Sequence, residues 1–124
     1  MPKNFWSGTY VRIGRSWLSE RTATLARKTG IEASRIEVRD LGFRWGSCGK
    51  HGVVLFNWRL LQLPVHLIDY VITHELVHLQ EPHHSPAFWQ AIDRALPVWR
   101  TLKDTLHNDG ARFLVFGMDS VRSL

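Results

Sequence analysis

The chain has 124 residues, of which 44% are hydrophobic, and this size predicts one domain, 1–124, with a single core. No apolar run is long enough to span a membrane, and the first residues lack the apolar segment of a signal peptide, so we expect a cytoplasmic protein. The lone cysteine, Cys48, excludes an internal disulfide framework. A net charge of +5 leaves two interpretations open, a generally solvated basic surface or a surface that attracts nucleic acid or nucleotides.

The segment 10–29 is predicted to form the first helix, because its apolar residues recur at helical spacing and Gly30 suits the end of the helix. Gly14 weakens the first turn, so the helix could begin later, near Ser16. A short connector, 31–34, follows it. The apolar positions of this helix are Val11, Trp17, Leu18, Leu25 and Ala26.

The segment 35–48 alternates in part between apolar and polar residues, which is typical of a strand, with a turn or bulge at 40–42. A turn cluster at 49–52 and a second strand at 53–57 complete a predicted β-hairpin. The exposed edge of such a hairpin could pair with an extended peptide, and the alternative is a purely structural sheet that covers the core. Asn57 is predicted to cap the helical turn that follows.

Three residues near the end of the first strand segment carry separate interpretations. Arg44 could orient a substrate or stabilise negative charge in a transition state, or it could instead pair with a carboxylate such as Asp69. Trp45 is interpreted as a core anchor. Cys48 is interpreted as a small buried residue, because a fourth protein ligand would close the open position that a catalytic metal needs.

The next helix, which starts at Pro64 and ends before Pro82, contains the H-E-x-x-H motif of His74, Glu75 and His78. The two histidines lie one turn apart and about 40° apart around the helix axis, so both imidazoles can reach one metal ion. Glu75 lies on the same side of the helix, where it can act as a general base without being a ligand. The motif therefore predicts a metal-dependent catalytic site.

A core helix that carries two histidines by chance is the alternative interpretation of this motif. The helix is apolar nearly all round, which predicts that it is buried, and buried histidines need partners. A bound metal ion would supply them. Tyr70, one turn before His74, could donate a hydrogen bond to an oxyanion, and its alternative role is that of a packed aromatic residue.

The third metal ligand is expected in the turn that follows this helix. Ser85 and Pro86 predict the start of another helix, with the serine as its N-cap, so His83 and His84 lie in a tight turn beside the metal-binding face. One of these two histidines would complete a three-histidine site with an open position for water, and the spacing does not decide which one. The following helix offers no glutamate as a ligand, since it carries only Asp93 as an acidic residue.

Two further helices are predicted at 86–96 and 98–107, separated by Pro97. The segment 112–116 could be a closing strand or a tail that docks on the surface. The remaining histidines show no spacing typical of metal ligands and are interpreted as ordinary surface or core residues: His51, His66 and His107.

Several motifs in the same order resemble the YgjP-like metallopeptidase family, which is related to the SprT-like and WLM zinc peptidases. The resemblance covers about 15–108 and is carried by the segments 44–48, 56–60, 68–79 and 84–89. It implies an α+β, zincin-like core in which the active-site helix packs with further helices and a small antiparallel sheet. It also places the hairpin beside the site, which favours peptide binding at the edge of the sheet. The resemblance identifies His84 as the third zinc ligand and leaves His83 as a solvated turn residue.

The function that we expect is therefore that of a zinc-dependent metallopeptidase acting on a peptide or protein. His74, His78 and His84 would hold Zn²⁺ with a water molecule at the open position, and Glu75 would take the proton of this water. Two alternatives are a metal-dependent hydrolase of nucleotide phosphoanhydrides and a DNA-associated module that processes bound proteins. The resemblance also implies a β-rich segment that family members usually carry ahead of this region. We expect the chain to lack most of it, so a partner protein could supply substrate-binding surface.

Overall fold

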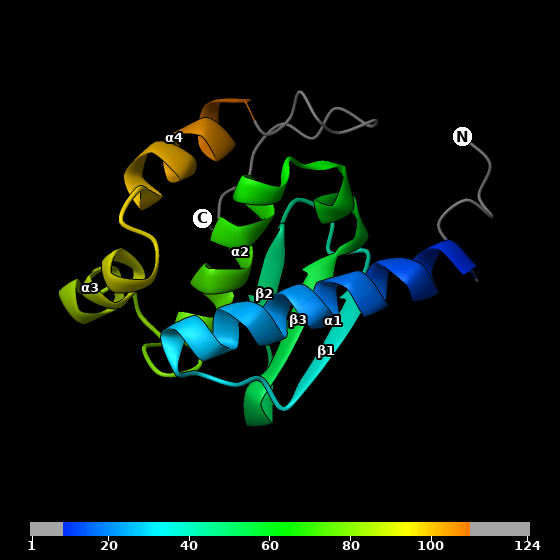
Figure 1. Ribbon diagram of the computed structural model, residues 1–124, viewed down its shortest axis with the longest axis horizontal. Coiled ribbons are helices and arrows are strands. Elements are labelled where there is room, and N and C mark those ends of the chain that lie inside the picture. Colours follow the sequence, from blue (N-terminus) through cyan, green and yellow to red (C-terminus); the bar gives the residue numbers. More distant parts are fainter. Residues whose placement is uncertain (1–8, 110–124) are drawn as a thin grey trace.

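The computed structural model describes residues 9–109, which fold into four α-helices and one small sheet (Figure 1). The predicted α+β class is confirmed. The predicted strand or tail at 112–116 lies outside the described residues. In chain order the elements are α1 (Thr9–Thr29), β1 (Arg35–Arg39), β2 (Gly46–Cys48), the 3-10 helix η2 (Lys50–Gly52), β3 (Val53–Asn57), the 3-10 helix η3 (Trp58–Gln62), α2 (Val65–His78), α3 (Pro86–Ala95) and α4 (Trp99–Asp109).

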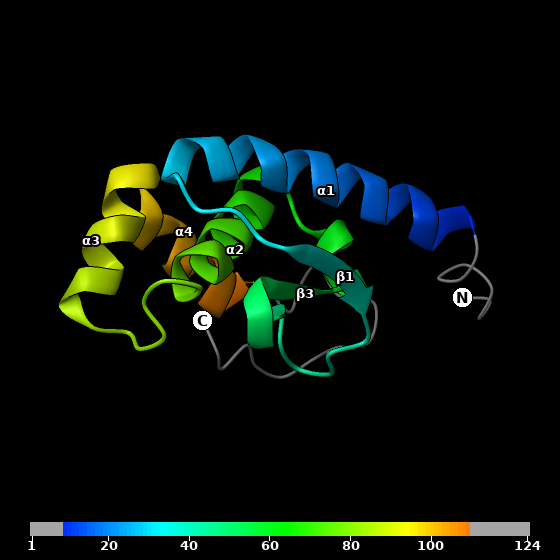
Figure 2. The same cartoon turned by 90° about the horizontal axis from the view of Figure 1, so that it is seen from below.

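Helix α1 crosses over α2 and over the sheet, and it packs on α2 and β1 (Figure 2). The helix begins at Thr9, so Gly14 does not delay its start. A Cβ atom at position 14 would lie 2.5 Å from Leu61 Cδ1, which shows that the glycine allows α1 to approach η3 closely. Leu18 and Leu25 are buried beneath the helix, as the helical spacing predicts.

The sheet has three strands in the order β1–β3–β2. Strands β2 and β3 form the predicted antiparallel hairpin, with Cys48 opposite Val54. Strand β1 pairs with β3 in parallel, with Arg35 opposite Val53, so the sheet is mixed and the predicted antiparallel pairing holds for β2 and β3. Of the two alternatives predicted at 40–42, a turn or a bulge, the structure has a turn, at 42–43. The segment 40–45 carries the chain past β3 and places β2 on the other side. As a result, β2 is an edge strand within the described part of the chain.

Helix α2 is the central element of the core and contacts α1, β2, α3 and α4. In Figure 1 it lies between β2 and the pair of helices α3 and α4. Ten of its fourteen residues are buried, including the polar residues Thr73, His74 and Glu75. The prediction of a buried helix that is apolar nearly all round is confirmed. Such a helix can hold catalytic side chains rigidly, since its position is fixed from several sides.

Helix α3 starts as predicted, because Ser85 Oγ accepts a hydrogen bond from the backbone N–H of Phe88 at 3.3 Å. Phe88 and Ile92 bury one face of α3 against α2, and Leu102 and Leu106 do the same for α4. Among the described residues, no helix combines the length and the apolar character needed to cross a membrane.

Candidate active site

Three histidines from two neighbouring segments converge at the end of α2. His74 and His78 lie one turn apart on α2, and His84 lies in the turn that leads into α3. The Nε2 atom of His84 is 2.9 Å from Nε2 of His78 and 3.3 Å from Nε2 of His74. The ligand atoms of all three residues lie within 4.8 Å of one another, so they could hold a single metal ion. His83 is exposed and is not part of this cluster.

The rings are oriented by contacts outside the cluster. Nδ1 of His78 lies 3.0 Å from the carbonyl oxygen of Glu81, and because a carbonyl only accepts, Nδ1 carries the hydrogen and Nε2 keeps its lone pair. The Phe88 ring packs on the rings of all three histidines, with centroids 4.5–5.0 Å apart. The cap at Ser85 fixes where α3 begins and therefore where His84 points.

The environment favours neutral imidazoles, which is the form that binds metals. Burial lowers the pKa of His74 to about 2, and the neighbouring His78 and His84 contribute in the same direction. The pKa values of His78 and His84 are also lowered, mainly by burial. His74 is fully buried, and its Nδ1 atom has no hydrogen-bond partner among the described residues. Three neutral nitrogen donors directed at one point suit a divalent cation.

Glu75 lies beside the cluster and is only 3% exposed. Burial raises the pKa of its carboxyl group to about 7, although a hydrogen bond from Cys48 and the charge of Arg44 act against this rise. Glu75 lines a cavity of about 500 Å³ together with His78 and His84. Arg44 and the residues of strand β2 line the same cavity. The histidine cluster, through His78 and His84, and a carboxylate of raised pKa therefore face the same space.

Arg44 lies at this cavity and is exposed, and its Nη1 donates to Ser47 Oγ at 3.3 Å. The alternative in which Arg44 pairs with Asp69 is wrong. Asp69 instead accepts two hydrogen bonds from Arg21, at 2.6 Å and 2.5 Å, and this pair connects α1 to α2. The positive charge of Arg44 is therefore available to the cavity.

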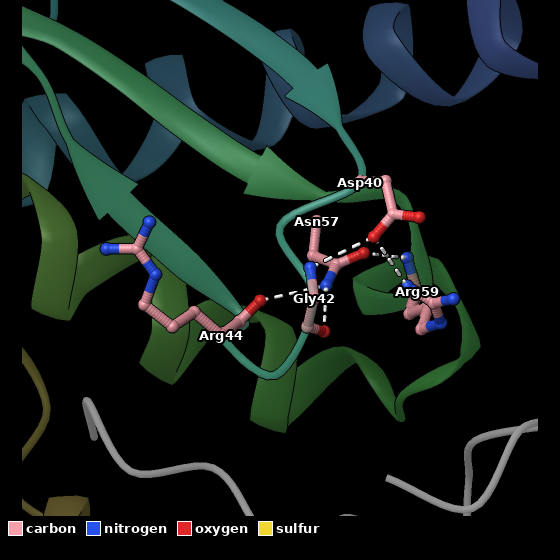
Figure 3. Close-up of polar contacts among 5 residues, drawn as sticks. All are labelled: Asp40, Gly42, Arg44, Asn57 and Arg59. Atoms are coloured by element: carbon pink, nitrogen blue, oxygen red, sulfur yellow. Dashed lines mark hydrogen bonds and ion pairs between the residues drawn. The ribbon is translucent and has the colours of Figure 1, made fainter.

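A polar network holds the loop that carries Arg44 (Figure 3). The amide of the fully buried Asn57 donates to the carbonyl oxygens of Gly42 and Arg44, at 3.1 Å and 2.9 Å. Its Oδ1 accepts from the backbone N–H of Arg59 at 3.1 Å, which confirms Asn57 as the cap of η3. Asp40 Oδ1 accepts from the backbone N–H of Gly42 at 2.9 Å and from Arg59 at 3.0 Å. In Figure 3 the Arg44 side chain points away from this network.

Tyr70 is fully buried, which favours its interpretation as a packed aromatic residue, and it is not part of the cavity wall. Its ring lies edge-on to that of His74, with centroids 5.8 Å apart. From the sequence Cys48 is interpreted only as a small buried residue, but it contacts the site directly. Its Sγ atom contacts Glu75, and it is half-buried in the cavity wall. Strand alternation places Gly46 and Cys48 on the same face, but it does not show that this face meets α2.

A buried helix that carries two of three converging histidines and an adjacent glutamate, beside a short edge strand, is an arrangement of the metallopeptidase class. The comparison with protein families gives the more specific identification. Residues 3–109 match the model of the YgjP-like metallopeptidase domain, so the chain belongs to the YgjP-like family.

The fold is also similar to that of a solved structure, the metallopeptidase zymogen of Pyrococcus abyssi abylysin. The TM-score is 0.66 and the sequence identity is 20%, over 72% of this chain and 90% of that chain. At this identity the similarity concerns the fold. No curated protein matches the chain by sequence.

Proposed function

We propose that the protein is a zinc-dependent metallopeptidase in which Glu75 is the general base. The observation that carries this proposal is the convergence of three histidine Nε2 atoms beside the buried Glu75 carboxylate, at a cavity that Glu75, His78 and His84 line. Membership of a metallopeptidase family supports a peptide bond as the substrate, in preference to a nucleotide phosphoanhydride or a DNA-associated role.

His74, His78 and His84 would hold the metal. Nitrogens bound tetrahedrally to one zinc ion lie about 3.3 Å from one another, given Zn–N bonds of about 2.0–2.1 Å. Two of the three separations, 2.9 Å and 3.3 Å, are close to this value, so the cluster is compatible with zinc. A bound Zn²⁺ would supply Lewis acidity, which polarises the scissile carbonyl and makes a water molecule more acidic.

Glu75 takes a proton from the attacking water as the new carbon–oxygen bond forms. It then delivers this proton to the amine as the carbon–nitrogen bond breaks. Because Glu75 follows the ligand His74 directly on α2, the helix fixes its distance from the metal-binding face. Arg44 contributes positive charge at the cavity, where the carbonyl oxygen becomes negative in the transition state.

Strand β2 binds the substrate. On one side it pairs with β3, and on the other side, within residues 9–109, it pairs with no strand and borders the cavity. An extended peptide can pair with such an edge and would then pass over the histidine cluster. This arrangement positions the scissile carbonyl near Glu75, so the substrate is a polypeptide in extended conformation.

The Glu75→Gln variant tests this function. We expect it to keep its zinc, measured by inductively coupled plasma mass spectrometry, and to lose hydrolysis of casein and of quenched fluorescent peptides. ATP serves as the comparison substrate for both proteins. Peptide hydrolysis that persists in the variant, or wild-type hydrolysis of ATP in place of peptides, would contradict the proposal.

A further inference from the structure

The inner face of β2, which consists of Gly46 and Cys48, lies directly against the Glu75 side chain. We propose that this face is a positioning surface that holds the Glu75 carboxylate in its catalytic orientation. The inference rests on the proposed function, since it assigns Glu75 as the general base. It gives a role to two residues of the segment 44–48 that the catalytic assignment leaves unexplained.

Gly46 is required by the proximity of Glu75. A Cβ atom at position 46 would lie 2.9 Å from Cγ of Glu75, 3.2 Å from Oε2 and 3.3 Å from Cδ. The backbone of Gly46 does not have a positive φ angle, unlike that of Gly30, Gly42 and Gly52, so its conformation is open to any residue. The absent side chain therefore serves the close approach of the carboxylate and not the turn of the chain.

Cys48 contacts Glu75 from the same face, two residues further along the strand. Its Sγ atom lies 3.0 Å from the Glu75 carbonyl oxygen and 3.4 Å from Oε1. A thiol donates one hydrogen, so these two acceptors share it. The thiol connects β2 both to the backbone of α2 and to the carboxylate.

The strand that carries this face is itself fixed. Gly46 pairs with Phe56 and Cys48 with Val54 in the antiparallel ladder with β3. The backbone N–H of Asn57 donates to the carbonyl oxygen of Trp45 at 2.9 Å, just before the strand begins. The surface is rigid enough to select one orientation of a side chain that has several rotamers available.

The contact of β2 with Glu75 affects the chemical step of hydrolysis. A general base must lie within hydrogen-bond distance of the proton that it takes. A misplacement of about 1 Å can reduce turnover by about 100-fold. Gly46 and Cys48 do not bind the metal in this arrangement, so their effect leaves metal content unchanged and falls more on kcat than on KM.

The Gly46→Ala variant tests the proposal directly. The added methyl group displaces Glu75, and we expect kcat for peptide hydrolysis to fall by about 100-fold, with zinc content unchanged and a much smaller effect on KM. Gly14→Ala is the matched control, since it adds the same methyl group against Leu61, away from the cavity. Its turnover should equal that of the wild type. Cys48→Ser keeps a hydrogen-bond donor and should retain more of kcat than Cys48→Ala.

A second measurement reports the contact without enzymatic activity. Cys48 is the only cysteine, so the rate at which iodoacetamide modifies the protein at pH 8 is the rate for this thiol. Burial and the charge of Glu75 raise the pKa of Cys48, which suppresses the reactive thiolate. We expect the Glu75→Gln variant to be modified at least about threefold faster than the wild type.

The outcomes separate this inference from the proposed function. Wild-type kcat in Gly46→Ala, or equal modification rates in wild type and Glu75→Gln, would overturn the positioning role while Glu75 remains the base. Peptide hydrolysis by Glu75→Gln would overturn the proposed function itself. If Gly46→Ala does not fold, the pair of Cys48 variants and the modification rates decide the question.

Discussion

The side-chain amide of Asn57 holds the backbone of Arg44, with a distance of 2.9 Å between Asn57 Nδ2 and the Arg44 carbonyl oxygen. The same buried side chain makes two more hydrogen bonds, to Gly42 and to Arg59 (Figure 3). Asn57, which caps η3, thus also fixes the loop that places the Arg44 guanidinium at the cavity. The fold and the site are connected at this residue, and the connection can be tested.

Replacing Asn57 with alanine should destabilise the protein. The variant loses three hydrogen bonds at a fully buried position, and each contributes about 1 kcal/mol. We therefore expect the free energy of unfolding to fall by about 3 kcal/mol. Urea denaturation followed by circular dichroism measures this difference. Asn108→Ala, at an exposed position of α4, is the control and should change stability little. Equal stability of both variants would show that the network does not hold the loop.

Replacing Arg44 with methionine should reduce turnover and leave the fold intact. The side chain is exposed at the cavity, so its removal costs little stability but removes charge that stabilises the transition state. By analogy with the loss of one oxyanion donor, kcat should fall by about 100-fold. Arg39→Met is the control, since Arg39 is exposed at the end of β1. A wild-type kcat in Arg44→Met would exclude the catalytic role.

Replacing His84 with alanine should remove most of the bound zinc. His84 supplies one of three converging nitrogens, whereas the adjacent His83, which is also exposed, lies outside the cluster. His83→Ala is therefore a closely matched control and should keep the zinc content of the wild type. Zinc content after dialysis, measured by mass spectrometry, distinguishes the two. If His83→Ala loses the metal and His84→Ala keeps it, the third ligand has been assigned to the wrong histidine.

The ion pair of Asp40 should make stability depend on pH in the acidic range. The backbone N–H of Gly42, followed by Arg59, lowers the pKa of Asp40 below its ordinary value of 3.8. The folded state thus favours the ionised carboxylate, and the stabilisation is present above the unfolded-state pKa and disappears as pH falls through the folded-state pKa. We expect Asp40→Asn to be less stable than the wild type at pH 7, with a difference that shrinks below about pH 4.

Thermal unfolding between pH 2.5 and 7 measures this effect. Glu20→Gln, which changes an exposed carboxylate on α1, is the control and should follow the wild type across the range. A difference between Asp40→Asn and the wild type that stays constant with pH would show that the ionised carboxylate is not the source of the stabilisation.

Much of the fold could be predicted because it depends on neighbours in sequence. The four helices lie close to their predicted ranges, and Ser85 and Asn57 cap helices as expected. Helical spacing alone places His74 and His78 on one face. The pairing of β1 could not be predicted in this way. Its partner is 18 residues away at Arg35 and Val53, and the alternation of a strand does not record the direction of its neighbour.

The sequence by itself determined the active-site helix and its H-E-x-x-H motif, because both follow from a period of 3.6 residues. Only the tertiary structure decided which groups this helix meets. In the folded chain Asp69 pairs with Arg21 and not with Arg44, and Gly46 and Cys48 pack against Glu75. These contacts join segments that are 27 or more residues apart. They arise from the packing of α1 and β2 on α2, which no local pattern encodes.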